Sequence, residues 1–220
     1  MPQESRPNIT LKLATSLDGK IALANGNSQW VTSEEARAHG RYLRVENDAI
    51  AVGAVTAELD NPQLTSRVPG QKDPVRVVFD TTLKLDPSSH LVTTARETPT
   101  WVFTRDGSEA RAEALREHGV VVHEITDKNG LSLEEALSIM AQAGLRSLLV
   151  EGGGTLIASF IRAGLFDTLH WYRAPVLLGG DGRDCVGALS LTQMDQAIYL
   201  HRMKVSEVGR DQHEIYVRAD

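Results

Sequence analysis

The feature that most constrains the fold is an alternation of short apolar runs with longer stretches of helical periodicity. Apolar runs typical of strands lie at residues 8–14, 49–55, 75–79, 100–104, 120–125 and 147–150. Helices are predicted between them at residues 32–47, 108–118 and 133–143. A strand, a helix and a second strand in succession favour parallel pairing, because the helix carries the chain back across the sheet. The sequence therefore predicts an α/β fold with a mostly parallel central sheet and flanking helices.

The last third of the chain has a different pattern. Extended runs cover residues 168–178, 197–208 and 213–218, with Gly209 at the turn between the last two. These runs predict antiparallel C-terminal strands. Trp171, Tyr172 and Val176 lie in the first run, and we expect them to form either a dimer surface or a buried sheet edge. No linker or internal repeat is visible, so residues 1–220 are expected to fold as one domain.

Composition and charge exclude several classes of protein. The net charge of −6 argues against a large nucleic-acid surface, because phosphate backbones are bound by concentrated Lys and Arg. The single cysteine, Cys185, cannot form an internal disulfide, and the seven histidines show no metal-ligand spacing, so we expect no metal. The first residues lack the apolar segment of a signal peptide, and no run is long enough to span a bilayer. A cytoplasmic protein with no membrane partner is expected.

The most informative motif is a strand, a run of glycines and a helix. The apolar residues 147–150 lead into Glu151, three glycines and Thr155, and a helix is predicted from there to about Ala163. Glycines let backbone amides approach a ligand closely, and a helix N-terminus attracts negative charge, so a pyrophosphate suits this turn. The spacing is not GxGxxG, so a Rossmann fold is not indicated. A tight connection with no ligand is the alternative, and Glu151 is then a solvated carboxylate.

A second group of candidate residues follows the strand at residues 49–55. A predicted loop carries Thr56, Asp60, Leu64 and Arg67, which places a carboxylate and a guanidinium on one segment that Pro62 stiffens. Asp60 taken alone is also an ordinary turn residue. The segment is therefore a candidate binding loop.

Further candidates lie near the N-terminus. Trp30, two residues after Ser28, could stack on a flat ring or pack in the core. The helix after it is expected to begin with a capping box of Thr32 and Glu35. Its arginines, at positions 37, 41 and 44, form one stripe that could bind phosphate or pair with nearby acidic residues. Lys12 is a cation in mid-strand, which indicates either a solvent-facing side chain or a functional one.

Taken in order, four segments resemble one known family. They are residues 11–20 (LKLATSLDGK), 28–30 (SQW), 60–65 (DNPQLT) and 151–156 (EGGGTL). Together they are similar to the reductase domain of the bifunctional riboflavin-biosynthesis deaminase-reductase, and the similarity covers about residues 7–217. The resemblance implies a dihydrofolate-reductase-like fold and a homodimer. It also implies NADPH-dependent reduction of the ribose of 5-amino-6-(5-phosphoribosylamino)uracil to the ribitylamino product.

The resemblance assigns roles to individual residues. Polar groups around the reacting ribose would be Lys12, Asp60 and Glu151, and such groups serve ring opening and proton delivery. The substrate would be held by Ser28, Arg44, Leu64, Arg67 and Glu151. The cofactor would contact Ala14, Trp30, Thr56, Asp60, Thr81, Gly153, Gly154, Thr155 and Leu156.

Two departures from the family pattern leave alternatives open. There is no HxE motif with a PCxxC partner, so this chain is expected to act as a stand-alone reductase without the zinc deaminase half. Residues 80–84 (DTTLK) differ from the usual pattern near the adenosine 2′-phosphate, which leaves NADH possible beside NADPH, with Arg105 as a further candidate contact. The alternatives are the same fold and cofactor acting on another pterin, pyrimidine or carbonyl compound, and a nucleotide-binding relative without catalysis.

Overall fold

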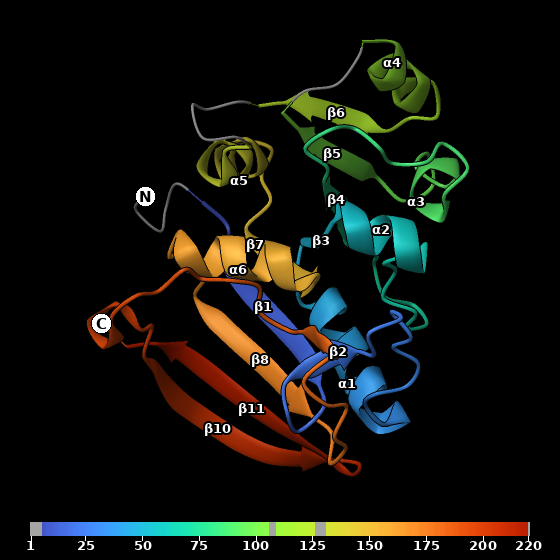
Figure 1. The fold of residues 1–220 in the computed structure, drawn as a ribbon. Helices are drawn as coiled ribbons and strands as arrows, with labels where there is room; N and C mark the ends of the chain where they lie inside the picture. The colour runs from blue at the N-terminus through green and yellow to red at the C-terminus, as the bar shows by residue number, and fades with distance from the viewer. Residues whose placement is uncertain (1–5, 106–108, 126–130, 220) are drawn as a thin grey trace. The chain divides into compact units, whose positions relative to one another are not determined.

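The computed structural model describes residues 6–105, 109–125 and 131–219 (Figure 1). The chain divides into two compact units. Unit 1 comprises residues 1–8 and 42–149, and unit 2 comprises residues 9–41 and 150–220. Strand β7 (Ser147–Gly152) contains one boundary between them and helix α1 (Glu34–Val45) contains another.

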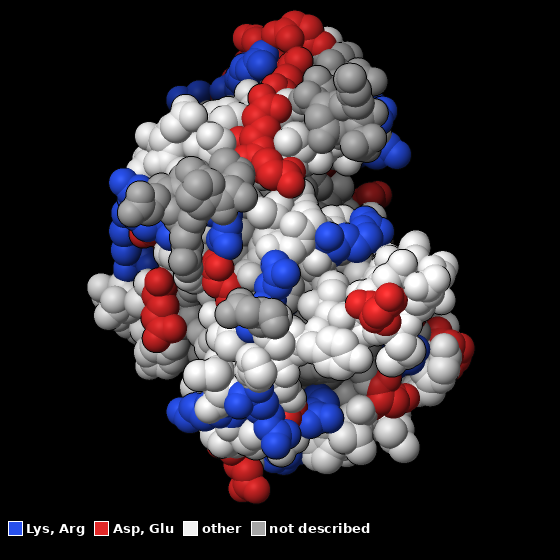
Figure 2. All heavy atoms as spheres, turned by 90° about the vertical axis from the view of Figure 1, so that its left-hand side faces the viewer, with Lys and Arg blue, Asp and Glu red and all other residues white. Residues whose placement is uncertain are grey.

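Unit 1 is built on four parallel strands. In sheet order they are β3 (Ala49–Gly53), β4 (Val75–Phe79), β5 (Thr100–Thr104) and β6 (Val121–Glu124). The helices of this unit are α2 (Ala54–Asp60), α3 (His90–Thr93), α4 (Glu109–Glu117) and α5 (Leu133–Gln142). The inner strands β4 and β5 are apolar because both of their faces are covered, with Val77, Val102 and Phe103 fully buried. Exposed Glu109, Glu113 and Glu117 give α4 the acidic surface seen in Figure 2.

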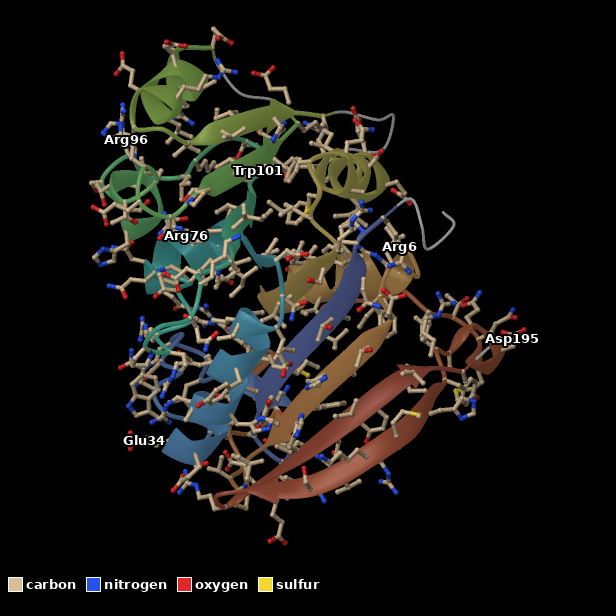
Figure 3. The ribbon with its side chains drawn as sticks, turned by 180° about the vertical axis from the view of Figure 1, so that it is seen from behind. Arg6, Glu34, Arg76, Arg96, Trp101 and Asp195 are labelled. Carbon is tan, nitrogen blue, oxygen red and sulfur yellow. The ribbon has the colours of Figure 1, made fainter. Side chains whose placement is uncertain are left out.

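Unit 2 is built on a mixed sheet. Its strands, in sheet order, are β10 (Leu200–Val208), β11 (Asp211–Arg218), β8 (Thr168–Arg173) and β1 (Asn8–Thr15). Strand β1 pairs in parallel with β8, and β11 pairs antiparallel with both β8 and β10. Helix α6 (Gly154–Arg162) and the first part of α1 lie on opposite faces of this sheet (Figures 1 and 3). A small second sheet pairs β2 (Lys20–Ala22) with β9 (Arg183–Asp184), and residues 194–196 form a 3-10 turn.

The sequence pattern predicted most of these elements. The mostly parallel pairing and the antiparallel C-terminal strands are confirmed. Ile9, Leu11 and Leu13 are buried as the alternation in β1 predicted. The expected start of α4 at residue 108 lies outside the described residues. Within those residues, no helix has the length and apolar character needed to cross a bilayer.

Three local expectations are wrong. The segment after β3 is not a loop, because residues 54–60 form helix α2. Strand β8, which was expected among the antiparallel strands, is parallel to β1 on one side. Helix α1 begins at Glu34, two residues after the predicted start at residue 32. It is capped by Ser33 instead of Thr32, because the Ser33 Oγ accepts a hydrogen bond from the Ala36 N–H at 3.2 Å. Of the two alternatives given for residues 171–176, a dimer surface or a buried sheet edge, the buried one holds for Tyr172, which is 1% exposed.

Candidate functional site

The candidate residues fall into two sets, one in each unit. In unit 2, Lys12 and Ala14 lie on the face of β1 that α1 covers, opposite the buried Leu11 and Leu13. Gly40 of α1 brings the helix backbone close to this lysine: a Cβ on Gly40 would lie 3.5 Å from Lys12 Cε. Lys12 is half-buried, so its ammonium is placed by the sheet and the helix together.

Trp30 lies before α1 with 64% of its surface exposed, which contradicts a core position and fits a stacking role. The guanidinium of Arg37 lies 4.2 Å from the indole centroid and also donates to the Thr32 carbonyl oxygen. This is a cation–π contact, and it holds the ring in place from one side. Trp30 and Arg37 line an open hollow of about 450 Å³. Ser28 is half-buried in the turn that precedes the tryptophan, where its carbonyl accepts from the Val31 N–H.

The glycine motif forms the connection between β7 and α6. Glu151 is half-buried near the carboxyl end of β7. Gly153 is the N-cap of α6 and has φ +75°, a conformation that favours glycine. Thr155 is exposed in the first turn, whereas the Leu156 side chain is buried, so only its main chain could meet a ligand. The predicted strand, glycine turn and helix are therefore all present.

The structure shows that Gly154 is required for close backbone packing, which is a different role from ligand binding. A Cβ on this residue would lie 2.6 Å from the Asp184 carbonyl oxygen. The Gly187 N–H donates to the Gly154 carbonyl oxygen at 2.8 Å, so a strand-like segment packs directly on the start of α6. Gly154 thus serves close backbone packing within unit 2, while Gly153 provides the sharp turn.

The second set lies in unit 1, on α2 and the loop that follows. Thr56 is half-buried in the first turn of α2, and Asp60 is its exposed last residue. In the loop that follows α2, three residues have left-handed backbones with φ between 38° and 56°. They are Asn61, Leu64 and Arg67. Left-handed backbones are costly for leucine and arginine, so contacts from elsewhere must impose them. Leu64 is buried and Arg67 is exposed.

Three side chains from outside the loop and one backbone N–H hold this loop in place. Arg44, in the last turn of α1, donates from Nη1 to the Thr65 carbonyl oxygen at 2.8 Å. Asp73 Oδ1 accepts from both the Ser66 N–H and the Ser66 hydroxyl, at 2.7 and 2.9 Å. Asn61 Oδ1 accepts from the His90 N–H. The loop is therefore pre-organised before any ligand binds.

Arg76, on β4, is a fully buried arginine of unit 1, and its side chain is labelled in Figure 3. It is 1% exposed. Its guanidinium donates to the carbonyl oxygens of residues 63, 91 and 98 and to the Thr94 hydroxyl. Burial lowers the pKa of Arg76 to about 10, which still leaves it charged at neutral pH. The contact to residue 63 joins this core arginine to the candidate loop.

The turn after β4 contains Thr81. Asp80 is 1% exposed and its Oδ2 accepts from the Leu85 N–H at 2.7 Å, which closes the turn. Its Oδ1 and the Thr104 hydroxyl are buried and have no hydrogen-bond partner among the described residues. Thr81 itself is exposed, and its carbonyl oxygen accepts from the Arg105 N–H. Arg111 of α4 reaches the same turn, with Nη1 3.5 Å from the Leu83 carbonyl oxygen.

Comparison with known proteins decides the family. Residues 7–214 match the model of the RibD C-terminal domain. This chain belongs to the RibD C-terminal domain family. A Bacillus amyloliquefaciens protein named riboflavin biosynthesis protein RibD is 40% identical over 209 residues, which are 93% of this chain and 56% of that protein. The chain thus spans about half the length of the curated relatives that it matches.

Solved structures confirm the fold expected of a RibD C-terminal domain. Acinetobacter baumannii RibD superposes with a TM-score of 0.84 and 28% identity, covering 98% of this chain and 59% of that one. A dihydrofolate reductase from Enterococcus faecalis gives a TM-score of 0.54 at 16% identity, covering 97% of each chain. The second likeness concerns the fold alone, and it confirms that this RibD domain is dihydrofolate-reductase-like.

Sequence reasoning missed the residues that position this RibD domain's candidate groups. Asp73 and Arg76 hold the loop at residues 61–67, and Tyr172 lies against Lys12. One signal was available: Arg76 interrupts an apolar strand, as Lys12 does, and that pattern marked Lys12 as unusual.

Within the described residues, no group of three His, Cys, Asp or Glu side chains could hold a metal ion.

Proposed function

We propose that this chain reduces the ribose of 5-amino-6-(5-phosphoribosylamino)uracil to a ribityl chain with NADPH. The observation that carries the proposal is the match of residues 7–214 to the RibD C-terminal domain. The motif residues Lys12, Asp60 and Glu151 are all present, and each is at least partly accessible to solvent. A domain retained only for binding nucleotides would have no need of three such polar groups.

The chemistry requires proton transfers that these three residues can serve. Ring opening breaks the bond between the anomeric carbon and the ring oxygen, and that oxygen takes up a proton. NADPH, when bound, supplies a hydride to the anomeric carbon. The amine nitrogen gives up its proton when the open chain forms an imine and regains one after the hydride is added, so the reaction consumes one hydride and one proton overall. We assign Lys12, Asp60 and Glu151 to stabilising and moving these protons.

The substrate phosphate needs cations and hydroxyl donors. Arg67 is exposed on a loop that Asp73 and Arg76 hold in place, so it can bind an anion with little loss of conformational freedom. Arg44 supports the same loop through the Thr65 carbonyl oxygen. We assign Arg44, Arg67 and the Ser28 hydroxyl to the phosphate, with Leu64 contributing through its main chain because its side chain is buried.

The residues present fit a dinucleotide cofactor. In unit 2, the sharp turn at Gly153 exposes the N-terminus of a nine-residue helix and the Thr155 hydroxyl, which suits a pyrophosphate. The exposed indole of Trp30 suits a nicotinamide ring, with Ala14 and Thr56 as further contacts. In unit 1, the orphaned Asp80 oxygen and the exposed Thr81 hydroxyl suit the ribose end.

Positive charge around the Asp80–Leu85 turn favours NADPH over NADH. The turn itself carries Lys84, and Arg105 and Arg111 contact its carbonyl oxygens through a backbone N–H and a guanidinium. A 2′-phosphate gains from such cations, whereas a 2′-hydroxyl gains little. An Arg111→Gln variant should raise KM for NADPH about tenfold, because a charge-assisted hydrogen bond contributes roughly 1.5–3 kcal/mol. KM for NADH should not change, and Arg116→Gln on the same helix serves as the matched control.

The decisive experiment follows the absorbance of the reduced cofactor with the authentic pyrimidine phosphate, using NADPH and NADH side by side. The proposal expects oxidation of NADPH, and Asp60→Asn should lower kcat while cofactor affinity stays nearly intact. Oxidation only with another pterin, pyrimidine or carbonyl compound would replace the substrate. Tight NADPH binding without oxidation across a substrate panel would identify a non-catalytic relative.

We also propose that the active form is a homodimer formed through β10. This strand is an edge of its sheet, and it exposes Met203 and Val205 at 65% and 44%. Tyr199, just before it, is 63% exposed. An apolar edge of this kind is typical of a surface that a second copy covers. Sedimentation should give the dimer mass for the wild type and the monomer mass for Val205→Lys, and a wild-type monomer would refute this assignment.

A further inference from the structure

Two histidine side chains, His39 and His213, contact Tyr172 and fix its position. It is 1% exposed on β8, and its ring stacks on His213 of β11 with centroids 4.4 Å apart and planes 13° apart. Its hydroxyl lies 2.7 Å from His39 Nδ1 on α1. One histidine therefore fixes the plane of the ring and the other fixes its hydroxyl.

The ring held in this way faces Lys12. The ammonium nitrogen lies 5.7 Å from the Tyr172 ring centroid, within the roughly 6 Å at which a cation and an aromatic face attract each other. On the helix side, the lysine lies close to Gly40 of α1, where a Cβ would be 3.5 Å from Lys12 Cε. Strand register also fixes the neighbours, because Lys12 is paired with His170 and Ala14 with Tyr172.

We propose that Tyr172 is a positioning residue that holds the Lys12 ammonium by its aromatic face, and that His39 and His213 hold Tyr172. The inference rests on the proposed function only in taking Lys12 to act on the substrate. An aromatic face attracts an ammonium group electrostatically, so the Tyr172 ring can hold the lysine side chain in one position.

The surrounding histidines are suited to this arrangement. His213 Nε2 lies 3.2 Å from His170 Nδ1, and His213 is 3% exposed. Burial lowers the pKa of both imidazoles to about 4, with a smaller contribution from neighbouring charges. Both rings are therefore neutral near pH 7 and add no positive charge beside Lys12.

The test lowers the attraction of the aromatic ring at position 172 for a cation and keeps the shape of the ring nearly unchanged. Tyr172 is replaced by Phe and then by mono-, di- and trifluorinated phenylalanine, which lose attraction for cations stepwise. We expect Phe to retain kcat within about threefold, and fluorination to lower kcat progressively to about a tenth, with KM for NADPH unchanged. In a Lys12→Met background, fluorination should have no effect on the residual rate. The same series at Tyr216, whose hydroxyl bonds Glu214 on β11, is the matched control.

A second readout does not depend on catalysis. Lysines of the full chain are reductively methylated with ¹³C, which keeps their charge, and the Lys12 signal is assigned with Lys12→Arg. The Tyr172 ring should shift that signal upfield, and Tyr172→Leu should abolish the shift. A Lys12 signal at the ordinary position in the wild type, or a kcat independent of fluorination, overturns the proposal. If no variant reduces the pyrimidine phosphate, the proposed function fails while the methyl shift still decides the contact.

Discussion

The neighbouring histidines His170, which is half-buried, and His213, which is buried, make the stability of the protein sensitive to mild acid. Burial lowers the pKa of each from the ordinary 6.5 to about 4 in the folded chain. As pH falls below 6.5, the unfolded chain takes up protons at these positions and the folded chain does not. Stability that is fully present above pH 6.5 is therefore lost progressively as pH falls toward 4.

The size of the effect follows from the two pKa values. One pH unit below 6.5 favours the unfolded state by about 1.36 kcal/mol for each histidine. At about pH 5, each histidine therefore removes on the order of 2 kcal/mol, and the pair up to about 4 kcal/mol. A domain has only roughly 5–15 kcal/mol in total, so the loss is large enough to measure.

Urea unfolding at about pH 7.5 and about pH 5 checks this prediction. The free energy of unfolding of the wild type should fall with pH, and that of His213→Gln should fall by on the order of 2 kcal/mol less. His118→Gln, at an exposed histidine directly after α4, should retain the wild-type loss. Equal losses for His213→Gln and the wild type would refute the reasoning, because they would show that His213 does not resist protonation in the folded state.

Three other substitutions test the packing of each unit. Gly154→Ala should destabilise the protein by about 1–3 kcal/mol in thermal unfolding, because its Cβ would lie 2.6 Å from the Asp184 carbonyl oxygen; an unchanged Tm would mean that the segment at residues 184–187 gives way easily. Gly40→Ala should instead stabilise α1 by up to about 1 kcal/mol, since its Cβ would meet Lys12 at an ordinary 3.5 Å, and a lower Tm would contradict this. Arg76→Met should cost more than about 3 kcal/mol, because it removes a buried guanidinium that donates to four partly or fully buried acceptors. A loss below about 1 kcal/mol would mean that water replaces it.

Local sequence patterns were sufficient to predict the strands and most of the helices, because each of those elements has a continuous apolar run or face of its own. Helix α2 was missed because its seven residues follow β3 directly, so that Val55 reads as a continuation of the strand. The parallel pairing of β8 with β1 was missed because it joins residues about 160 positions apart, and no local pattern records such a partner.

The candidate site also contains features that the sequence predicted and features that it did not. The sequence marked Gly153, Trp30 and Lys12 as candidates because each is an unusual residue for its place in a strand, turn or core. The left-handed backbones of Leu64 and Arg67 could not be predicted, since neither residue is a turn former. Contacts from Arg44, Asp73 and Arg76 hold the loop that contains them, and those contacts exist only in the folded chain.

Lys12 and Arg76 show why a cation inside an apolar strand does not by itself identify a site. Both interrupt a buried strand, yet Arg76 is 1% exposed and donates four hydrogen bonds to carbonyl and hydroxyl oxygens, so its charge serves the packing of unit 1. Lys12 is half-buried and lies over an aromatic ring that two histidines hold. An arginine surrounded by backbone acceptors supports a fold, whereas an accessible lysine on an aromatic face is arranged to meet a ligand. The surroundings of the charge, which the sequence does not record, separate the two roles.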